Sequence, residues 1–226
     1  MGNTVVISSP VVKSTNMASL AELKRNSIYD SLKLGSLGLA KEAFDYALKG
    51  LDIMKAVGKV ENYNVISIVD FSKASSQKRL FVLDLKNYKV LFNTYVAHGS
   101  NSGKEYAQNF SNDPSSNKSS LGFYETLGTY NGEHGYSLKL QGLEKGINDN
   151  ANMRNIVMHG ADYVGANIVR EHGYIGRSWG CPAIPPALQV PIIQKIKNGT
   201  CLFIYSPDKN YLDHSAILKQ AAMPVM

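Results

Sequence analysis

The hydrophobic periodicity of this chain changes at Gly58, and that change limits the folds that the chain can adopt. In "AKEAFDYALKGLDIMKAVG" the apolar side chains recur every three or four residues, the pattern of a helix with one buried face. The stripe consists of Phe44, Ala47, Leu48, Leu51 and Met54, and Gly58 follows it as a C-terminal cap. A shorter helix is expected over residues 20–34. We therefore predict a helical portion, residues 17–58, that packs against one side of the core.

The segments after residue 58 have the composition of strands. "VISIVDF" is a short apolar run, and "RLFVLDL" and "VLFNTYVA" flank a tight hairpin turn around Asn87. "GYSLKLQG" alternates apolar and polar residues, and "NIVMHG" and "CLFIYSP" indicate two further strands. A short helix is predicted near "PPALQVPIIQKIKNG". Strands therefore dominate the chain from about residue 64 onward.

A long loop interrupts these strands. The segment from His98 to Ser120 is dense in Ser, Asn and Gly and has almost no apolar periodicity. Loops longer than about 15 residues are more often functional than idle in compact domains. The predicted organisation is an extended or disordered lead-in (1–16), the helical portion (17–58), one β-rich domain (59–212) and a C-terminal tail (213–226). The fold class is mainly β, or α+β with the helices included.

Size and charge exclude several classes of protein. With 226 residues and 44% apolar composition, the chain is long enough to bury a full core. The net charge of +6 is spread along the sequence, which gives little support for nucleic-acid binding; an anionic polymer such as a cell wall is an equally good partner. No apolar stretch approaches the roughly 20 residues of a membrane span. The start, "MGNTVVISSPVVKSTN", lacks the pattern of a signal peptide.

The two cysteines lie in different surroundings. Cys201 is in the apolar run "TCLFIYSP" and is expected to be a buried strand thiol. Cys181 lies between Gly180 and Pro182, at a predicted bend that presents the thiol. "NIVMHG" ends at His159, so a strand end delivers an imidazole, and an imidazole activates a thiol for attack on a carbonyl. Spacing alone leaves open a catalytic thiol and a turn with an incidental one, and a bond between the two cysteines would exclude catalysis.

The residues around this Cys and His resemble a known family. "MHGADYV" followed by "SWGCPA" is similar to the His-Gly … Ser-x-Gly-Cys signature of the L,D-transpeptidase catalytic domains, cysteine enzymes that remodel bacterial peptidoglycan. The stretches "VAHGSNSG", "FSNDPSSNKSSLGFY" and "HGYSLKLQGLEKGINDNA" extend the resemblance over about residues 35–212. It implies a barrel-like or sandwich-like catalytic domain of the L,D-transpeptidase type.

The resemblance also implies roles for individual residues. Cys181 would be the nucleophile and His159 its general base or ion-pair partner, with the Gly160 carbonyl orienting the imidazole. The amides of Gly180 and Cys181 would form the oxyanion hole, and Ser178 would shape the loop. No metal or organic cofactor is expected, and the five histidines show no local zinc-ligand spacing.

In this family the thiolate attacks a stem-peptide carbonyl, a D-amino acid leaves and a thioester forms. An amine from a second stem then completes a cross-link, or water trims the stem. The implied function is therefore a peptidoglycan L,D-transpeptidase, with an L,D-carboxypeptidase or a non-catalytic peptidoglycan-binding protein as alternatives. The implied partners are stem peptides, and the implied location is periplasmic or otherwise extracytoplasmic. The oligomeric state stays open.

The sequence departs from the family pattern beside the cysteine. Trp179 stands where the commonest members carry His, and Pro182 and Ala183 replace an apolar residue and a polar one. The candidates for substrate binding are Arg177, Trp179, Tyr163, His98 and His134. Arg177 is suited to hold a stem carboxylate through a bidentate pair. A structural role is an equal alternative for the arginine and the better one for both histidines.

Overall fold

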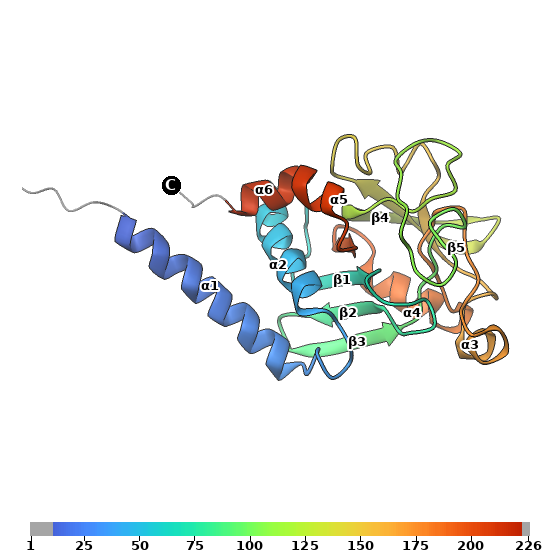
Figure 1. Cartoon of the computed structure of the whole chain (residues 1–226), viewed down its shortest axis with the longest axis horizontal. Helices are drawn as coiled ribbons and strands as arrows, with labels where there is room; N and C mark the ends of the chain where they lie inside the picture. Colours follow the sequence, from blue (N-terminus) through green and yellow to red (C-terminus); the bar gives the residue numbers. More distant parts are fainter. Residues whose placement is uncertain (1–10, 223–226) are drawn as a thin grey trace, which may run out of the picture.

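The structure is a computed structural model that describes residues 11–222 (Figure 1). Helix α1 (Val11–Ser31) begins inside the segment predicted to be extended, so that prediction is wrong for residues 11–16; residues 1–10 lie outside the described part. The physical reason is the lack of a helix breaker. Pro10 directly precedes the helix and no Gly or Pro follows before Gly35, while the Val, Ser and Thr residues cost only tenths of a kcal/mol each.

Helix α2 (Lys41–Ala56) carries the predicted apolar stripe, and all five stripe residues are buried. Gly58 ends the helix as predicted, with a φ of +67°, and the next residue, Lys59, donates its N–H to Met54 O at 2.8 Å. At Gly50 a Cβ atom would lie 2.0 Å from the Phe123 ring. The helix therefore rests directly on the sheet.

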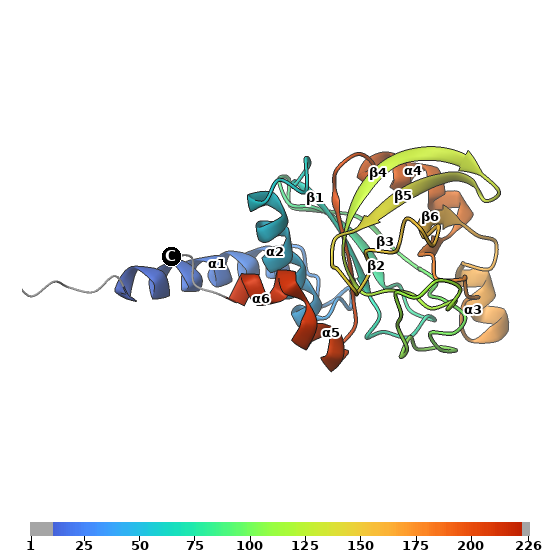
Figure 2. The ribbon, with the colours of Figure 1, turned by 90° about the horizontal axis from the view of Figure 1, so that it is seen from above.

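The sheet has eight strands in the order β3-β2-β1-β8-β4-β5-β6-β7. They are β1 (Val65–Asp70), β2 (Leu80–Asp84), β3 (Lys89–Thr94), β4 (Gly122–Gly132), β5 (Gly135–Gly142), β6 (Val157–Gly160), β7 (Ala183–Ile184) and β8 (Cys201–Tyr205). The pairs β1–β8 and β6–β7 are parallel and the other pairs are antiparallel. The sheet curls into a nearly closed barrel (Figure 2), which confirms the predicted barrel-like, mainly β fold with N-terminal helices.

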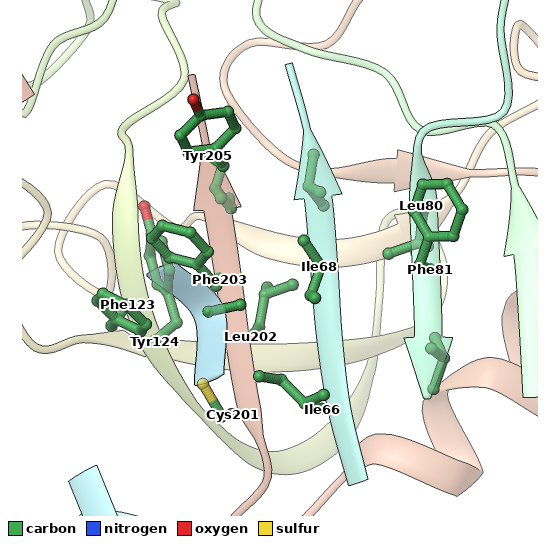
Figure 3. Packing of buried hydrophobic residues seen from close by; sticks show 14 of the residues in the cluster. Ile66, Ile68, Leu80, Phe81, Phe123, Tyr124, Cys201, Leu202, Phe203 and Tyr205 are labelled. Carbon is green, nitrogen blue, oxygen red and sulfur yellow. The ribbon is translucent and has the colours of Figure 1, made fainter. Parts of the chain in front are cut away.

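The core joins the buried face of α2 to the central strands. Figure 3 shows its buried side chains on β1, β2, β4 and β8. Phe123 of β4 and Phe203 of β8 stack with ring centroids 4.2 Å apart. Cys201 of β8 is fully buried, as predicted, and its Sγ lies 3.5 Å from Met54 Sδ. Both cysteines are free, so no disulfide removes Cys181 from chemistry.

Residues 213–222 are part of the fold, which corrects the predicted tail for these residues; residues 223–226 lie outside the described part. Helix α5 (Lys209–His214) crosses the predicted boundary, and α6 (Ala216–Ala222) packs against α2. Buried Glu144 holds this segment: its carboxylate accepts hydrogen bonds from Ser215 Oγ, from Tyr211 Oη at 3.1 Å and from the Phe123 N–H at 2.9 Å. These polar contacts are long-range and leave no periodic signal in the sequence.

The long loop and the β4–β5 hairpin lie near the predicted site, and the sequence predicted the loop better than the hairpin. The segment His98–Ser120 contains no helix or strand, as predicted, whereas β4, the longest strand, was not predicted. The pairing of β4 with β5 is irregular between Thr126 and Thr129, and the hairpin curves over the barrel (Figure 2).

Helix α4 (Pro186–Ile196) matches the predicted short helix, and α3 (Ala166–His172) was not anticipated. Between residues 11 and 222 no helix is both long enough and apolar enough to cross a membrane.

Candidate active site

Strand pairing brings Cys181 beside the strand that carries His159. β6 and β7 run parallel with His159 opposite Ala183 and Gly160 opposite Ile184, so Cys181 precedes β7 next to the start of β6. The Cys181 Sγ accepts a hydrogen bond from the Val157 N–H at 3.4 Å and lies 3.6 Å from Asn155 O. The thiol therefore packs against the backbone of residues 155–157.

The His159 imidazole is held by its neighbour's backbone. Its Nδ1 lies 3.0 Å from Gly160 O, and since a carbonyl only accepts, Nδ1 carries the proton and Nε2 is the basic nitrogen. The contact expected for Gly160 is therefore present. The side chain is buried at 3% exposure. Burial lowers the pKa of His159, the Gly160 carbonyl opposes this by raising it, and the charge of His134 lowers it further.

Thiol and imidazole do not contact each other directly. Among the described residues, the structure shows no hydrogen bond between Cys181 Sγ and His159. Such contacts are often long in unliganded sites and tighten when substrate binds. Burial raises the pKa of Cys181, while the Val157 N–H and the positive charge of Arg154 lower it.

Ser178 shapes the bend that presents the thiol. Its Oγ donates to Cys181 O at 2.6 Å and accepts the Gly180 N–H at 3.1 Å. Because Ser178 already occupies the Gly180 amide, the predicted oxyanion role of Gly180 is not supported. The Cys181 N–H has no acceptor among the described residues and stays available.

Gly180 is required at this bend by its own conformation. Its φ is +124°, and a Cβ atom would lie 2.8 Å from Lys118 O and 2.9 Å from Ile156 Cδ1. Ser119 Oγ also donates to Gly180 O at 3.3 Å. The bend is therefore packed against the end of the loop 98–120.

Three of the predicted substrate-binding residues are at least partly exposed. Trp179 is 80% exposed and stands two residues before Cys181. Arg177 is exposed and donates from Nη1 to Ser100 O at 3.4 Å and Gly103 O at 3.3 Å. Tyr163 is half-buried; burial, and after it the negative charge of Cys181, raises its pKa to about 12.

The two other predicted substrate-binding residues have different positions. His98 is fully buried, with Nδ1 2.6 Å from Arg79 Nη2 and Nε2 3.2 Å from Gly103 O, so its side chain cannot contact substrate. Its backbone O accepts the Ser178 N–H at 2.9 Å, which supports the bend. His134 is exposed at the tip of the β4–β5 hairpin, and its ring stacks on the His159 ring with centroids 4.3 Å apart.

One residue of the site escaped the sequence analysis. Arg154, just before β6, donates four hydrogen bonds to residues between 111 and 120. No motif or periodicity marks it, because its partners, two carbonyls and two serine hydroxyls, are distant in sequence.

One cavity lies elsewhere and shares no residue with the site. It has a volume of about 370 Å³ and is lined by residues of α1, α2 and the β2–β3 hairpin, including Arg25, Asp52 and Tyr88. The part of the chain between residues 11 and 222 has no group of three His, Cys, Asp or Glu side chains placed to hold a metal ion.

The sequence was also compared with known proteins. The model of the L,D-transpeptidase catalytic domain family matches residues 36–205, which is most of the chain. The chain therefore belongs to the L,D-transpeptidase catalytic domain family. No significant match was found among curated proteins.

Solved structures of the same kind are similar at low identity. An L,D-transpeptidase from Mycobacterium smegmatis is 12% identical, with a TM-score of 0.40 over 63% of this chain and 59% of that one. The L,D-transpeptidase LdtMt1 in complex with imipenem is 12% identical, with a TM-score of 0.39 over the same shares. The helical cell shape determining protein Pgp2 from Campylobacter jejuni is 14% identical, with a TM-score of 0.43 over 77% of this chain and 60% of that one. The chain thus spans about six tenths of their length.

Proposed function

We propose that this protein is a cysteine L,D-transpeptidase that acts on peptidoglycan stem peptides. Membership of the family supports the reaction class. The observation that carries the proposal is the placement of the Cys181 thiol beside β6, the strand on which Gly160 O fixes His159 with Nε2 as its basic nitrogen. A thiol on a tight bend and an oriented imidazole are the two groups that acyl transfer through a thioester requires.

Each step of the reaction has a residue to perform it. His159 Nε2 takes the thiol proton, and the Cys181 thiolate attacks the carbonyl carbon of the acyl donor. The free Cys181 N–H stabilises the negative oxygen of the tetrahedral intermediate. As the intermediate collapses, the C–N bond breaks, His159 returns the proton to the leaving amine, and a D-amino acid departs. The acyl group is then a thioester on Cys181.

The fate of the thioester defines the product. An amine of a second stem attacks it to form a cross-link and regenerate the thiol; attack by water gives a shortened stem instead. We place the protein among the transpeptidases, with L,D-carboxypeptidase activity as the side reaction of the same intermediate. Because peptidoglycan stems mature outside the cytoplasm, the proposed location is extracytoplasmic.

Carbapenem acylation tests the nucleophile. LdtMt1 was solved with imipenem, and we expect imipenem to add its mass to this protein and not to Cys181→Ala. His159→Ala should label much more slowly at neutral pH. Equal labelling of Cys181→Ala and wild type would show that the nucleophile is another residue.

The product test uses disaccharide-tetrapeptides and mass spectrometry. Dimers that form with wild type and not with Cys181→Ala establish a transpeptidase. Tripeptides without dimers identify a carboxypeptidase. Unchanged substrate from a protein whose thiol is reduced and accessible argues for a peptidoglycan-binding role.

A further inference from the structure

The guanidinium of Arg154 ties the long loop to the bend that holds Cys181. Its Nη1 donates to Ser111 O at 2.7 Å and to Ser120 Oγ at 2.6 Å. Its Nη2 donates to Lys118 O at 2.7 Å and to Ser116 Oγ at 3.1 Å. One planar side chain thus closes the end of the loop through four donors, a geometry that lysine cannot reproduce.

The same guanidinium lies against the nucleophile's own bend. A Cβ atom on Gly180 would be 3.3 Å from Arg154 Nη2, and the same position would be 2.8 Å from Lys118 O, which Arg154 binds. On its other side, Arg154 is followed by Asn155, whose carbonyl lies 3.6 Å from the Cys181 Sγ. Arg154 therefore lies next to the Gly180 bend and directly precedes the residue whose carbonyl faces the Cys181 thiol.

The charge of Arg154 is not neutralised by a neighbouring acid. Within the described part of the chain no carboxylate oxygen lies within 4.0 Å of its guanidinium, and all its hydrogen-bond acceptors are uncharged. Asp113 acts on it only from a longer range. The guanidinium is half-buried, so water screens its charge incompletely.

The other titratable groups around Cys181 do not supply a permanent positive charge. His159 on β6 is buried with Nδ1 bound to a carbonyl, and burial lowers its pKa. Tyr163, after β6, is uncharged or negative, and His134 of the β4–β5 hairpin lies over the His159 ring. An arginine, by contrast, stays protonated at every physiological pH.

We propose that Arg154 is the positioning residue of this site, supplying the fixed positive charge that stabilises the Cys181 thiolate while it clamps the loop 111–120 against the bend. This inference rests on the proposed function, because a stabilised thiolate matters only if Cys181 is the nucleophile. Consistent with the geometry, the charge of Arg154 lowers the pKa of Cys181 against the raising effect of burial. Removing the charge therefore reduces the fraction of thiolate at neutral pH.

The test measures the pH dependence of Cys181 alkylation by iodoacetamide, followed by intact-protein mass spectrometry on the full chain. Cys201 is fully buried, so a single adduct reports Cys181, and Cys181→Ala is the blank. For Arg154→Gln we expect the midpoint of the rate profile to move to higher pH and the rate at pH 7 to fall about three- to tenfold, since one pH unit corresponds to a tenfold change in thiolate. Arg154→Lys, which keeps the charge, should keep the midpoint close to wild type.

Two controls separate charge from architecture. Ser120→Ala removes one acceptor of Arg154 and keeps the charge, so its midpoint should match wild type. Arg170→Gln removes an exposed arginine on α3 and should also leave the midpoint unchanged. An unshifted midpoint in Arg154→Gln overturns the proposal, and so does a shift in Arg154→Lys or Ser120→Ala as large as that in Arg154→Gln.

The readout is independent of turnover. If the wild-type protein neither reacts with imipenem nor converts stem peptides, the proposed function fails, while the alkylation midpoints still decide whether Arg154 stabilises the thiolate. If imipenem acylates wild type and Arg154→Gln at equal rates across the pH range, the function stands and the role of Arg154 is refuted.

Discussion

The imidazoles of His134 and His159 stack with ring centroids 4.3 Å apart and planes inclined by 20°. The hairpin that carries His134 is fixed near its tip by Gln189 of α4, whose Nε2 donates to Tyr136 O at 2.6 Å and to His134 O at 3.2 Å. The hairpin tip therefore covers the candidate base and removes it from water. The base is buried by a segment that is 25 residues away in sequence.

The stack predicts a pH effect of substituting His134. Both burial and the charge of His134 lower the pKa of His159, so His134→Ala, which removes both, should raise that pKa. His134→Phe keeps the stack and removes the charge, and should raise it less. We expect the acid limb of the pH–rate profile to move to higher pH in the same order, because the base acts when neutral. NMR titration of the His159 ring measures this directly, and a pKa that falls in His134→Ala would contradict it.

Buried His98 makes the fold sensitive to acid. Burial, with the charge of Arg79 as the second cause, lowers the pKa of His98 to about 4, against 6.5 for an unperturbed histidine. Below pH 6.5 the unfolded chain therefore binds a proton at His98, whereas the folded protein binds that proton only near pH 4. Stability is retained above pH 6.5, and roughly 2 kcal/mol should be lost between pH 7 and pH 4.5.

Urea unfolding at both pH values measures this loss. The control is His98→Gln, which has no proton to bind in either state; its loss between the two pH values should be smaller by about the same amount. An equal loss in both proteins would show that other groups control acid unfolding.

Glu144 anchors the C-terminal helices to the barrel. Glu144→Ala leaves the Phe123 N–H and the hydroxyls of Tyr211 and Ser215 without their buried acceptor. Unpaired buried donors cost about 1–3 kcal/mol each and are not additive, so we expect a loss of about 2–4 kcal/mol in the free energy of unfolding. Exposed Glu171→Ala on α3 should stay within about 0.5 kcal/mol of wild type. A Glu144→Ala protein as stable as Glu171→Ala would refute the anchor.

Trp179 is expected to serve substrate binding and not stability. With 80% of its surface exposed, it loses little packing on truncation, so Trp179→Ala should unfold within about 0.5 kcal/mol of wild type. The KM of Trp179→Ala for a disaccharide-tetrapeptide should rise several-fold, because the exposed indole ring, two residues before Cys181, offers a surface for stacking. Val190→Ala, an exposed apolar residue on α4, is the matched control. An unchanged KM would remove Trp179 from the binding surface.

Gly180→Ala should damage both the bend and its chemistry. The added Cβ is forced to within 2.8 Å of Lys118 O at a φ of +124°, so we expect a loss of roughly 1–3 kcal/mol and slower imipenem acylation. Gly173→Ala isolates the backbone effect, since its φ is +81° and no atom lies within 4 Å of the new Cβ. Equal stability and acylation in the two variants would show that the contact with the loop is unimportant.

The sequence alone indicated most of the local structure. The stripe on α2, the hairpin at Asn87, the buried strand of Cys201 and the bend at Gly180 all follow from side-chain periodicity or from backbone freedom, which are properties of neighbouring residues. The segments that differed depend on other forces. Helix α1 extends through Val11–Asn16 because nothing breaks it, and α6 is ordered by its contact with α2.

The candidate site divides in the same way. The sequence determined the residue types of the candidate groups, Cys181 and His159, and the flexible glycine beside the thiol. Only the tertiary structure decided which histidine is buried against Arg79 and which one stacks on His159, and it alone brought Arg154 to the thiol. The physical reason is that these contacts join segments distant in the chain. The burial of these side chains and the charges around them are therefore set only when the sheet has closed.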